Sequence, residues 1–224
     1  PEKVEPDEEL KAILKKLSDQ PQNAVVIISG RKREILEKWF GDLNVDLVGE
    51  HGVWLRINDA DWELIEKLEN NWKNEILPIL DLYVDRTPGS YVETKDYSLV
   101  WHYRKADPGQ GIVRARELVD HLVYLTSNLS LQVLEGNKVV EVKTAGVNKG
   151  RAAFRWIALK NWDFILALGD DWTDEDIFRV LPKNAYSIKV GIASTEAKYK
   201  IKSPKEVRTL LTKLAEVDQD EGSK

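Results

Sequence analysis

The stretch that decides the fold runs from residue 164 to residue 176 and reads Phe164-Ile-Leu-Ala-Leu-Gly-Asp-Asp-Trp-Thr-Asp-Glu-Asp176. A short apolar run leads directly into a segment that is dense in aspartate and glutamate. This order predicts a buried strand over Phe164–Leu168, an acidic loop at its carboxyl end, and a helix over Asp174–Leu181. Ligands of open α/β sheets bind at the carboxyl ends of the strands, so the loop is a candidate site.

The rest of the chain repeats this alternation on both sides of a differently patterned insert. Ala24-Val-Val-Ile-Ile28 is a second β-branched run, and it breaks at Ser29-Gly30-Arg31 into a helical pattern that ends near Gly41. Such alternation is typical of a doubly wound α/β domain with a parallel sheet. The other helices expected in this domain cover residues 5–17, 62–82, 149–159 and 204–215, and the other expected strands cover residues 46–49, 53–56 and 187–190.

Residues 87–146 have a different texture, with hairpin-type turns such as Gly136-Asn137. Their pattern predicts two strands, a helix and two more strands, which is the order of a small antiparallel α+β domain. We therefore expect a core formed by residues 1–86 and 147–224, with residues 87–146 inserted into it. The elements expected in the insert are Tyr91–Lys95, Leu99–Arg104, Gly111–Leu125, Leu131–Leu134 and Val139–Val142.

Composition excludes several classes of protein. The 33 basic residues against 38 acidic ones give a net charge of −5, which argues against a nucleic-acid binder. No apolar run approaches the length of a membrane span, and the polar, acidic start is unlike a signal peptide, so we expect a cytoplasmic protein without membrane contact. The absence of cysteine excludes cysteine nucleophiles and thiolate metal sites.

The acidic loop is the strongest candidate for a metal site. Neighbouring carboxylates repel one another, and Mg²⁺ relieves that repulsion through oxygen ligands. The alternative is that these residues only begin a helix, whose amino end favours negative charge. We expect both: Asp174–Asp176 start the helix, while Asp170 and Asp171 face the crevice at the strand end.

Two further strand-to-helix junctions suit a phosphate group. Ser29-Gly30-Arg31 combines a hydroxyl donor, a close-approach glycine and a helix start, although it also fits a plain serine-capped turn. Lys149, between Asn148 and Gly150, can neutralise a phosphate, although alone it also fits a solvated lysine. If the junctions meet at one edge of the sheet, they form a site for a phosphate and a metal.

These segments carry a specific resemblance. Ile28-Ser-Gly-Arg31, Asn148-Lys-Gly150 and Gly169-Asp-Asp171 resemble motifs two, three and four of the haloacid dehalogenase-like phosphatases. More narrowly, the chain resembles the trehalose-6-phosphate phosphatases, whose domain also forms the C-terminal part of trehalose-6-phosphate synthase-like proteins. The segments that carry this narrower resemblance are Gly49-Glu-His-Gly52, Arg86-Thr-Pro-Gly-Ser90, Glu93-Thr-Lys95, Trp101-His-Tyr-Arg104, Val139-Val-Glu-Val142 and Gly169–Asp176.

The resemblance implies a Rossmann-like haloacid dehalogenase core with a parallel sheet, an inserted α+β cap, and Mg²⁺-dependent hydrolysis of trehalose 6-phosphate. It implies that Ser29 and Lys149 bind the phosphoryl group, with Gly30 and Arg31 beside them. Asp170 is the implied metal ligand, and Asp171 is expected to order the metal shell or a bound water. A trehalose-6-phosphate synthase domain or subunit is an implied partner.

The resemblance also implies that the cap covers the core site and reads the sugar. The cap residues assigned to the sugar are Glu93, Lys95, Arg104 and Glu141, and His51 is expected to line the crevice from the core. Carboxylates and cationic side chains suit sugar hydroxyls, which both donate and accept hydrogen bonds. The alternative is that these charges are the solvated outer face of an antiparallel sheet.

One family motif is not found in these 224 residues. The family begins with a strand that ends in Asp-x-Asp-Gly-Thr, whose first aspartate takes up the phosphoryl group and whose second is the general acid and base. We expect that strand to lie upstream of Pro1 in the complete protein, because the motifs that serve the nucleophile are intact. The alternative is a noncatalytic domain that binds a sugar phosphate or a synthase partner.

Overall fold

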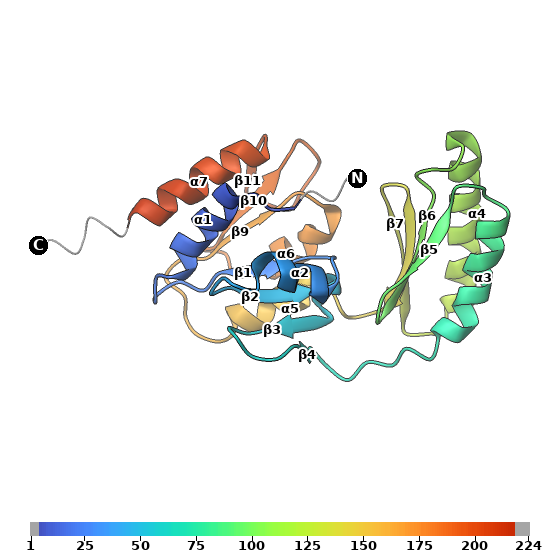
Figure 1. Ribbon diagram of the computed structural model, residues 1–224, viewed down its shortest axis with the longest axis horizontal. Coiled ribbons are helices and arrows are strands. Elements are labelled where there is room, and N and C mark those ends of the chain that lie inside the picture. Colours follow the sequence, from blue (N-terminus) through green and yellow to red (C-terminus); the bar gives the residue numbers. More distant parts are fainter. Residues whose placement is uncertain (1–4, 218–224) are drawn as a thin grey trace, which may run out of the picture. The chain divides into compact units, whose positions relative to one another are not determined.

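A computed structural model describes residues 5–217 of the chain. These residues form two compact units, which we call the core and the cap (Figure 1). The core contains residues 5–65 and 147–217, and the cap contains residues 66–146. None of the helices within residues 5–217 combines the length and the apolar character that crossing a bilayer requires.

The core is built from short strands and amphipathic helices. Its helices are α1 (Glu8–Ser18), α2 (Arg33–Phe40), α5 (Lys149–Ile157), α6 (Glu175–Val180) and α7 (Pro204–Val217), with 3₁₀ turns η1 (Glu50–Gly52) and η2 (Trp172–Asp174). Its strands are β1 (Val26–Ile28), β2 (Asp46–Gly49), β3 (Trp54–Arg56), β4 (Glu63–Leu64), β9 (Leu166–Gly169), β10 (Tyr186–Val190) and β11 (Tyr199–Ile201). The mixed α/β fold with parallel strand pairs confirms the predicted fold class.

The core strands form two sheets. In one, β1 pairs in parallel with β2, and β3 and β4 continue antiparallel from it. In the other, β9, β10 and β11 are parallel, with β10 in the middle. Among the described residues, β1 and β9 are therefore end strands, and their apolar residues are only half-buried.

Helix α5 links these two sheets. Its buried residues Ala152 and Trp156 pack against the side chains of β1. The helix also contacts α6, which in turn contacts β9. On β2, the buried carboxylate of Asp46 accepts the indole N–H of Trp156 at 2.5 Å, which ties the helix to the sheet. The ends of β1 and β9 are thereby held on the same helical layer.

The cap is a four-stranded antiparallel sheet with two helices on one face. The strands are ordered β5-β6-β8-β7. Rows of residues such as Val92, Trp101 and Val140 face the helices, while the alternate row Glu93, Val100 and Glu141 lies on the opposite face. The elements of the cap are α3 (Lys73–Asp85), β5 (Tyr91–Thr94), β6 (Ser98–His102), α4 (Pro108–Thr126), β7 (Leu131–Gly136) and β8 (Val139–Thr144).

The long helix predicted over Trp62–Leu82 is wrong. Residues 63–64 form strand β4 against β3, and Trp62 donates its indole N–H to Glu37 at 2.7 Å. The helix begins only at Lys73, after a turn in which the N–H of Lys73 binds the carbonyl of Asn70. The spacing of apolar residues from 62 to 72 imitates a helix, but tertiary contacts and the turn-forming asparagines decide otherwise.

The division between the units also differs from the predicted one at one end. We expected the cap to begin at residue 87, whereas the compact unit begins at residue 66. The reason is α3, whose buried residues Ile76, Leu80 and Tyr83 pack in the same cluster as Leu99 and Trp101 of the cap sheet. At the other end, the unit ends at Gly146.

Candidate active site

The turn after β1 positions Ser29 and Gly30. The N–H of Ser29 continues the pairing to Val48 at 2.9 Å, and its hydroxyl oxygen accepts the N–H of Arg31 at 3.2 Å. The hydroxyl is thus the acceptor of a local turn, and its own proton stays available for a ligand. Helix α2 begins after Lys32, which is its N-cap, so the alternative of a serine helix cap is wrong.

His51 packs directly on this turn. Its N–H donates to the carbonyl of Ser29 at 2.9 Å, and a Cβ added at Gly30 would lie 2.2 Å from its Nε2. His51 adopts a left-handed conformation with φ of 60°, which the tight turn between β2 and β3 requires. Gly30 is therefore the residue that lets the imidazole reach the turn after β1.

The same turn joins the His51 region to the start of α5. A Cβ at Gly52 would lie 2.7 Å from the carbonyl oxygen of Asn148, so the two backbones are in close contact. Asn148 caps α5 by accepting the N–H of Arg151 at 2.8 Å. This cap places Lys149 in the first turn of the helix, next to the junctions after β1 and β2.

Lys149 is a buried residue that pairs with the acidic loop. Its Nζ lies 2.7 Å from Oδ1 of Asp174, and both side chains are less than a tenth exposed. The other oxygen of Asp174, Oδ2, accepts the N–H of Asp171 at 2.9 Å. The alternative of a solvated lysine is therefore wrong, and the ion pair connects the start of α5 to the loop after β9.

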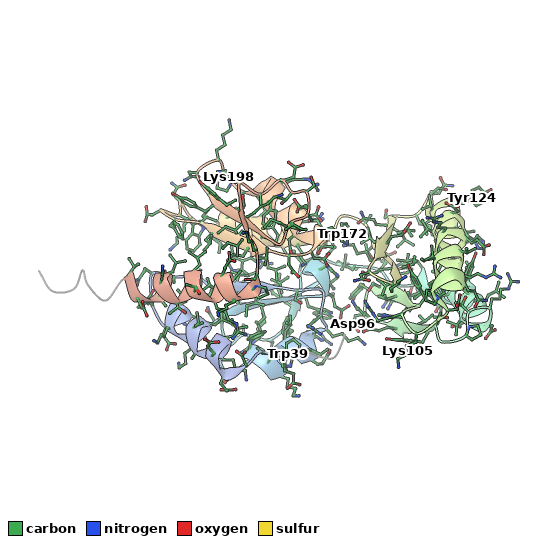
Figure 2. All side chains as sticks on the ribbon, turned by 90° about the horizontal axis from the view of Figure 1, so that it is seen from above. Trp39, Asp96, Lys105, Tyr124, Trp172 and Lys198 are labelled. Atoms are coloured by element: carbon green, nitrogen blue, oxygen red, sulfur yellow. The ribbon has the colours of Figure 1, made fainter. Side chains whose placement is uncertain are left out.

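The two aspartates assigned to the metal have different environments. Asp171 uses its carboxylate in a capping box with Asp174, and its Oδ1 also accepts the N–H of Trp172 at 2.7 Å. Asp170 is exposed, and within residues 5–217 its carboxylate has no hydrogen bond or ion pair. The neighbouring Trp172 is 45% exposed and lies at the surface of the core (Figure 2). Asp170 is thus the carboxylate that the loop leaves available.

Carboxylate oxygens in the acidic loop are the kind of donor that Mg²⁺ binds. Mg²⁺ keeps several waters and takes one or two carboxylates together with phosphate oxygens. The available carboxylate of Asp170 fits that requirement. Within the described part of the chain, no group of three or more histidine, cysteine, aspartate or glutamate side chains forms a complete protein cage.

In the cap, two ion pairs hold the residues assigned to the sugar. Glu93 Oε2 lies 3.0 Å from Nε2 of His102, whose ring stacks on Tyr91 with centroids 4.6 Å apart. Lys95 Nζ lies 3.9 Å from Oε1 of Glu141, and both side chains are almost buried. The alternative of a freely solvated face therefore does not describe Lys95 and Glu141.

The two arginines among the predicted site residues, Arg104 and Arg31, are exposed and contact other groups. Arg104 was expected on a strand beside His102, but β6 ends at His102, and Arg104 is exposed and donates to the carbonyl of Asn137 at 2.9 Å. The turn that leads into α4 therefore removes it from the row that contains Glu93. Arg31 is exposed and stacks over Trp39 at 4.5 Å from the ring centroid.

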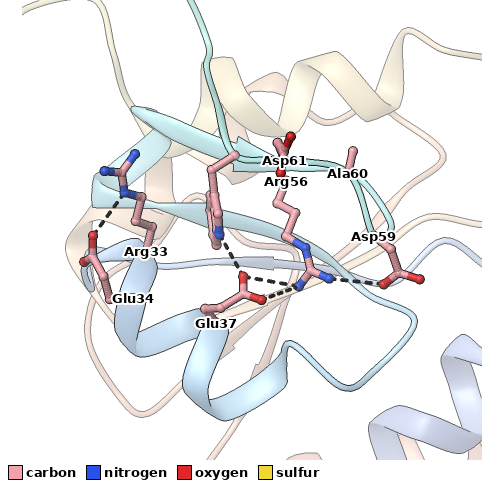
Figure 3. A pocket seen from close by; sticks show the side chains of 8 residues that line it. Arg33, Glu34, Glu37, Arg56, Asp59, Ala60 and Asp61 are labelled. Atoms are coloured by element: carbon pink, nitrogen blue, oxygen red, sulfur yellow. Dashed lines mark hydrogen bonds and ion pairs between the residues drawn. The ribbon is translucent and has the colours of Figure 1, made fainter.

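A cavity of about 300 Å³ beside α2 is lined by charged residues (Figure 3). One lining residue is Arg56, whose buried guanidinium lies 3.3 Å from Glu37 and 3.1 Å from Asp59. Glu37 also accepts the indole N–H of Trp62. These contacts pair the buried charge of Arg56 within the protein. They also attach the segment after β3 to α2, so we assign the charged residues of the cavity a structural role.

Sequence reasoning assigned Asp174 only to a helix start, whereas the structure makes it the partner of Lys149 and of the Asp171 backbone. The spacing of four residues between Asp170 and Asp174 was the available signal. Lys189 was not singled out, although it is 2% exposed and contacts the same loop. Its signal was a lysine between two apolar residues, Ile188 and Val190, in a strand.

A family model described as trehalose-phosphatase matches residues 1–210. The chain belongs to the trehalose-phosphatase family. This confirms the resemblance drawn from the motifs.

Among solved structures, the C-terminal domain of the Candida albicans trehalose-6-phosphate phosphatase superposes with a TM-score of 0.88 at 32% identity, over 97% of this chain and 87% of that chain. The Aspergillus fumigatus trehalose-6-phosphate phosphatase matches with a TM-score of 0.70 at 34% identity, over 97% of this chain and 86% of that chain. Both are trehalose-phosphatases, so the fold of this family member is that of its relatives.

Curated relatives are longer proteins. The bifunctional trehalose-6-phosphate synthase/phosphatase of Thermoproteus tenax is 38% identical over 214 residues, which is 96% of this chain and 29% of that protein. The α,α-trehalose-phosphate synthase (UDP-forming) B of Dictyostelium discoideum is 39% identical over 222 residues, which is 96% of this chain and 28% of that protein. The chain thus spans less than a third of the length of each of these two relatives.

Proposed function

We propose that this domain hydrolyses trehalose 6-phosphate to trehalose and phosphate. The observation that carries the proposal is the buried pair of Lys149 and Asp174, which joins the start of α5 to the acidic loop beside an available Asp170. Family membership supplies the substrate, because phosphatases of this family are named for it.

The core residues act on the phosphoryl group. Lys149 uses one proton of its ammonium for Asp174 and keeps two for phosphate oxygens. The hydroxyl proton of Ser29 is a further donor, since the oxygen already accepts the N–H of Arg31. Donors held in place before the reaction stabilise the charge that develops on the transferring group.

Mg²⁺ is proposed as the cofactor, with Asp170 as the residue that holds it. When bound, the cation neutralises charge on the phosphoryl oxygens. Asp171 is not free to bind in the same way, because its carboxylate caps the turn at η2. We therefore assign Asp171 to the shape of the loop, which keeps Asp170 exposed at the end of β9.

The proposed nucleophile is an aspartate carried by a strand between β1 and β9. Both strands are half-buried end strands, and α5 and α6 cover them as one layer, so an added strand would complete the sheet. The carboxylate would attack phosphorus, and the bond between phosphorus and the sugar oxygen would break as a second aspartate protonates that oxygen. Water would then hydrolyse the aspartyl-phosphate.

The cap residues Glu93, Lys95 and Glu141 are proposed to bind the sugar. They lie on the sheet face opposite the helices, in two ion pairs that present both donors and acceptors. Sugar hydroxyls can form hydrogen bonds with both members of such ion pairs, because each hydroxyl donates one hydrogen bond and accepts others. A trehalose-6-phosphate synthase domain is the proposed partner, as the names of the relatives suggest.

The test measures phosphate release by the protein with an Asp-x-Asp-Gly-Thr segment at its amino end. Asp170→Asn is expected to lower turnover of trehalose 6-phosphate and of a small aryl phosphate alike, by about 10²-fold or more. Glu93→Ala and Glu141→Ala are expected to lower turnover of trehalose 6-phosphate far more than that of the aryl phosphate. Equal losses on both substrates for the cap variants would contradict the assignment of these carboxylates to the sugar.

A noncatalytic role is the second candidate, and it is favoured by relatives such as the Dictyostelium discoideum protein, which is named as a synthase. A domain of this kind would bind trehalose 6-phosphate or a synthase without turnover. Binding of trehalose 6-phosphate by the protein carrying the segment, with no phosphate release above background, would establish the noncatalytic role and overturn the enzymatic one.

A further inference from the structure

Strand β10 carries a lysine that the proposed reaction does not use. Lys189 is 2% exposed, and its neighbours along the strand are Ile188 and Val190. A buried ammonium is unfavourable unless it is paired and hydrogen-bonded. Its Nζ donates to the carbonyl of Asp171 at 2.8 Å and lies 3.2 Å from Oε1 of Glu175. The lysine therefore reaches from the middle strand of one sheet to the acidic loop.

Glu175 is the second member of this group. It begins α6, is 9% exposed, and its Oε2 accepts the hydroxyl of Thr195 at 3.0 Å and the N–H of Glu196 at 2.8 Å. Burial raises the pKa of Glu175, but these hydrogen bonds and the nearby Lys189 lower it by more, so the pKa lies below its ordinary value. The carboxylate thus also holds the segment that follows β10.

The backbone of Asp171 is held on both sides by charged groups. Its N–H donates to Asp174, which is itself paired with Lys149, and its C=O accepts from Lys189. The N–H of Asp171 and the carbonyl carbon of Asp170 belong to the same planar peptide group. Fixing this peptide plane therefore also fixes the backbone of Asp170 and the direction of its side chain. Two lysines from different elements thus hold the loop that carries the available carboxylate.

We propose that Lys189, together with Glu175, is a positioning residue that holds the Asp171 carbonyl and thereby keeps the carboxylate of Asp170 aimed for its ligand. Packing alone does not explain the lysine, because apolar residues of similar volume often replace buried ion pairs without loss of stability. The hydrogen bond from its ammonium to the carbonyl of Asp171 does explain why a lysine is present at this position. The inference rests on the proposed function in naming Asp170 as the functional carboxylate, while the effect of Lys189 on the loop backbone is independent of it.

The experiment separates positioning from simple charge balance. Lys189→Met removes the donor and leaves Glu175 buried without its cation, so stability and loop geometry are both expected to suffer. The double variant with Glu175→Gln removes the stranded charge, and its amide can still accept the bonds from Thr195 and Glu196. We expect the melting temperature of the double variant to lie above that of Lys189→Met, while the carbonyl of Asp171 still lacks its hydrogen-bond donor. The matched control is Lys200→Met, an exposed lysine on β11 that donates to Ala193.

The primary measurement is hydrogen exchange of the amides in residues 169–176 of the chain without metal. The single and the double variant are both expected to exchange at Asp171 and Trp172 about tenfold faster than the unaltered chain, which is the weight of one charge-assisted hydrogen bond. Lys200→Met is expected to leave these amides unchanged. Recovery of slow exchange in the double variant, or exchange within about twofold of the unaltered chain in Lys189→Met, would overturn the proposal.

The second measurement is Mg²⁺ binding by calorimetry, with inorganic phosphate present and with the Asp-x-Asp-Gly-Thr segment at the amino end of the protein. Both variants are expected to raise the Mg²⁺ dissociation constant about tenfold, as a misdirected carboxylate loses one strong ligand contact. Unchanged Mg²⁺ affinity in a variant with fast loop exchange would show that Lys189 does not act through Asp170, which overturns the proposal. If the protein with unaltered Lys189 binds no Mg²⁺ under these conditions, the metal role of Asp170 in the proposed function fails, and the exchange result alone then decides whether Lys189 holds the loop.

Discussion

Replacing Lys149 by methionine tests the contact on which the candidate site depends. Lys149 is the first residue of α5, and methionine and lysine have similar helix propensities, so the change leaves the helix intact. What it removes is the cation 2.7 Å from Asp174, whose side chain is 7% exposed. The carboxylate then stays buried with the N–H of Asp171 as its remaining donor at 2.9 Å.

The magnitude follows from this geometry. Removing one partner of a buried ion pair destabilises a protein by about 3–5 kcal/mol. Because Asp174 keeps one N–H donor, we expect the low end, about 3 kcal/mol. In a chain of this size each kcal/mol lowers the melting temperature by about 2–4 °C, so the expected decrease is about 6–12 °C.

The assay is thermal and urea unfolding at neutral pH, with a double variant and a surface control. Adding Asp174→Asn to Lys149→Met removes the stranded charge and keeps an acceptor for Asp171, so about 1–2 kcal/mol should return. The control is Lys15→Met, because Lys15 pairs at 2.8 Å with Asp19, and the two side chains are 60% and 50% exposed. Such surface pairs contribute little, and the control should change stability by less than about 0.5 kcal/mol.

Two results would refute this reasoning. A loss below about 1 kcal/mol for Lys149→Met would mean that Asp174 is solvated in solution and not buried against the lysine. A double variant that is less stable than Lys149→Met would mean that the charge of Asp174 has another buried partner. In either case the start of α5 would not be joined to the acidic loop in the way the structure describes.

Three further outcomes are expected. Gly30→Ala should disturb the His51 imidazole, because its Cβ would lie 2.2 Å from the ring, and the His51 side-chain NMR signals should shift while the melting temperature falls by a few degrees. Asp46→Ala should destabilise the core by about 2–3 kcal/mol in urea unfolding, because the indole N–H of Trp156 loses its buried acceptor. Glu175 has a lowered pKa when folded, so its contribution to stability is present above its unfolded value near 4.5 and is lost as the pH falls through the folded value. Glu175→Gln should therefore make acid unfolding below pH 4.5 shallower, and an unchanged slope would contradict this account.

Local patterns in the sequence determined several of the strands and the position of candidate site residues at their ends. Apolar runs that end in Ser29-Gly30 and in Asp170-Asp171 predicted two strands with functional residues at their carboxyl ends, and β1 and β9 lie there. Hairpin signals predicted the antiparallel cap sheet. These features depend on neighbours in the chain, because the alternation of side chains along a strand and the chemistry of turns are local properties.

Other features depended on residues far apart in the chain, and only the tertiary structure decided them. The apolar spacing over residues 62–72 fits a helix, yet Trp62 binds Glu37 and residues 63–64 pair with β3. The cap likewise begins at residue 66 because α3 buries its apolar face against the cap sheet.

The acidic loop shows the same division most clearly. Its sequence predicted that Asp170 and Asp171 would face the crevice after a strand and that Asp174 would only begin the next helix. The structure separates them, because Lys149 lies 2.7 Å from Asp174 and Lys189 lies 2.8 Å from the Asp171 carbonyl. The lysines come from positions 25 residues before Asp174 and 18 residues after Asp171. Burial requires each ammonium to find an anion or a carbonyl, and only the packing of α5 and β10 around the loop decides which one it finds.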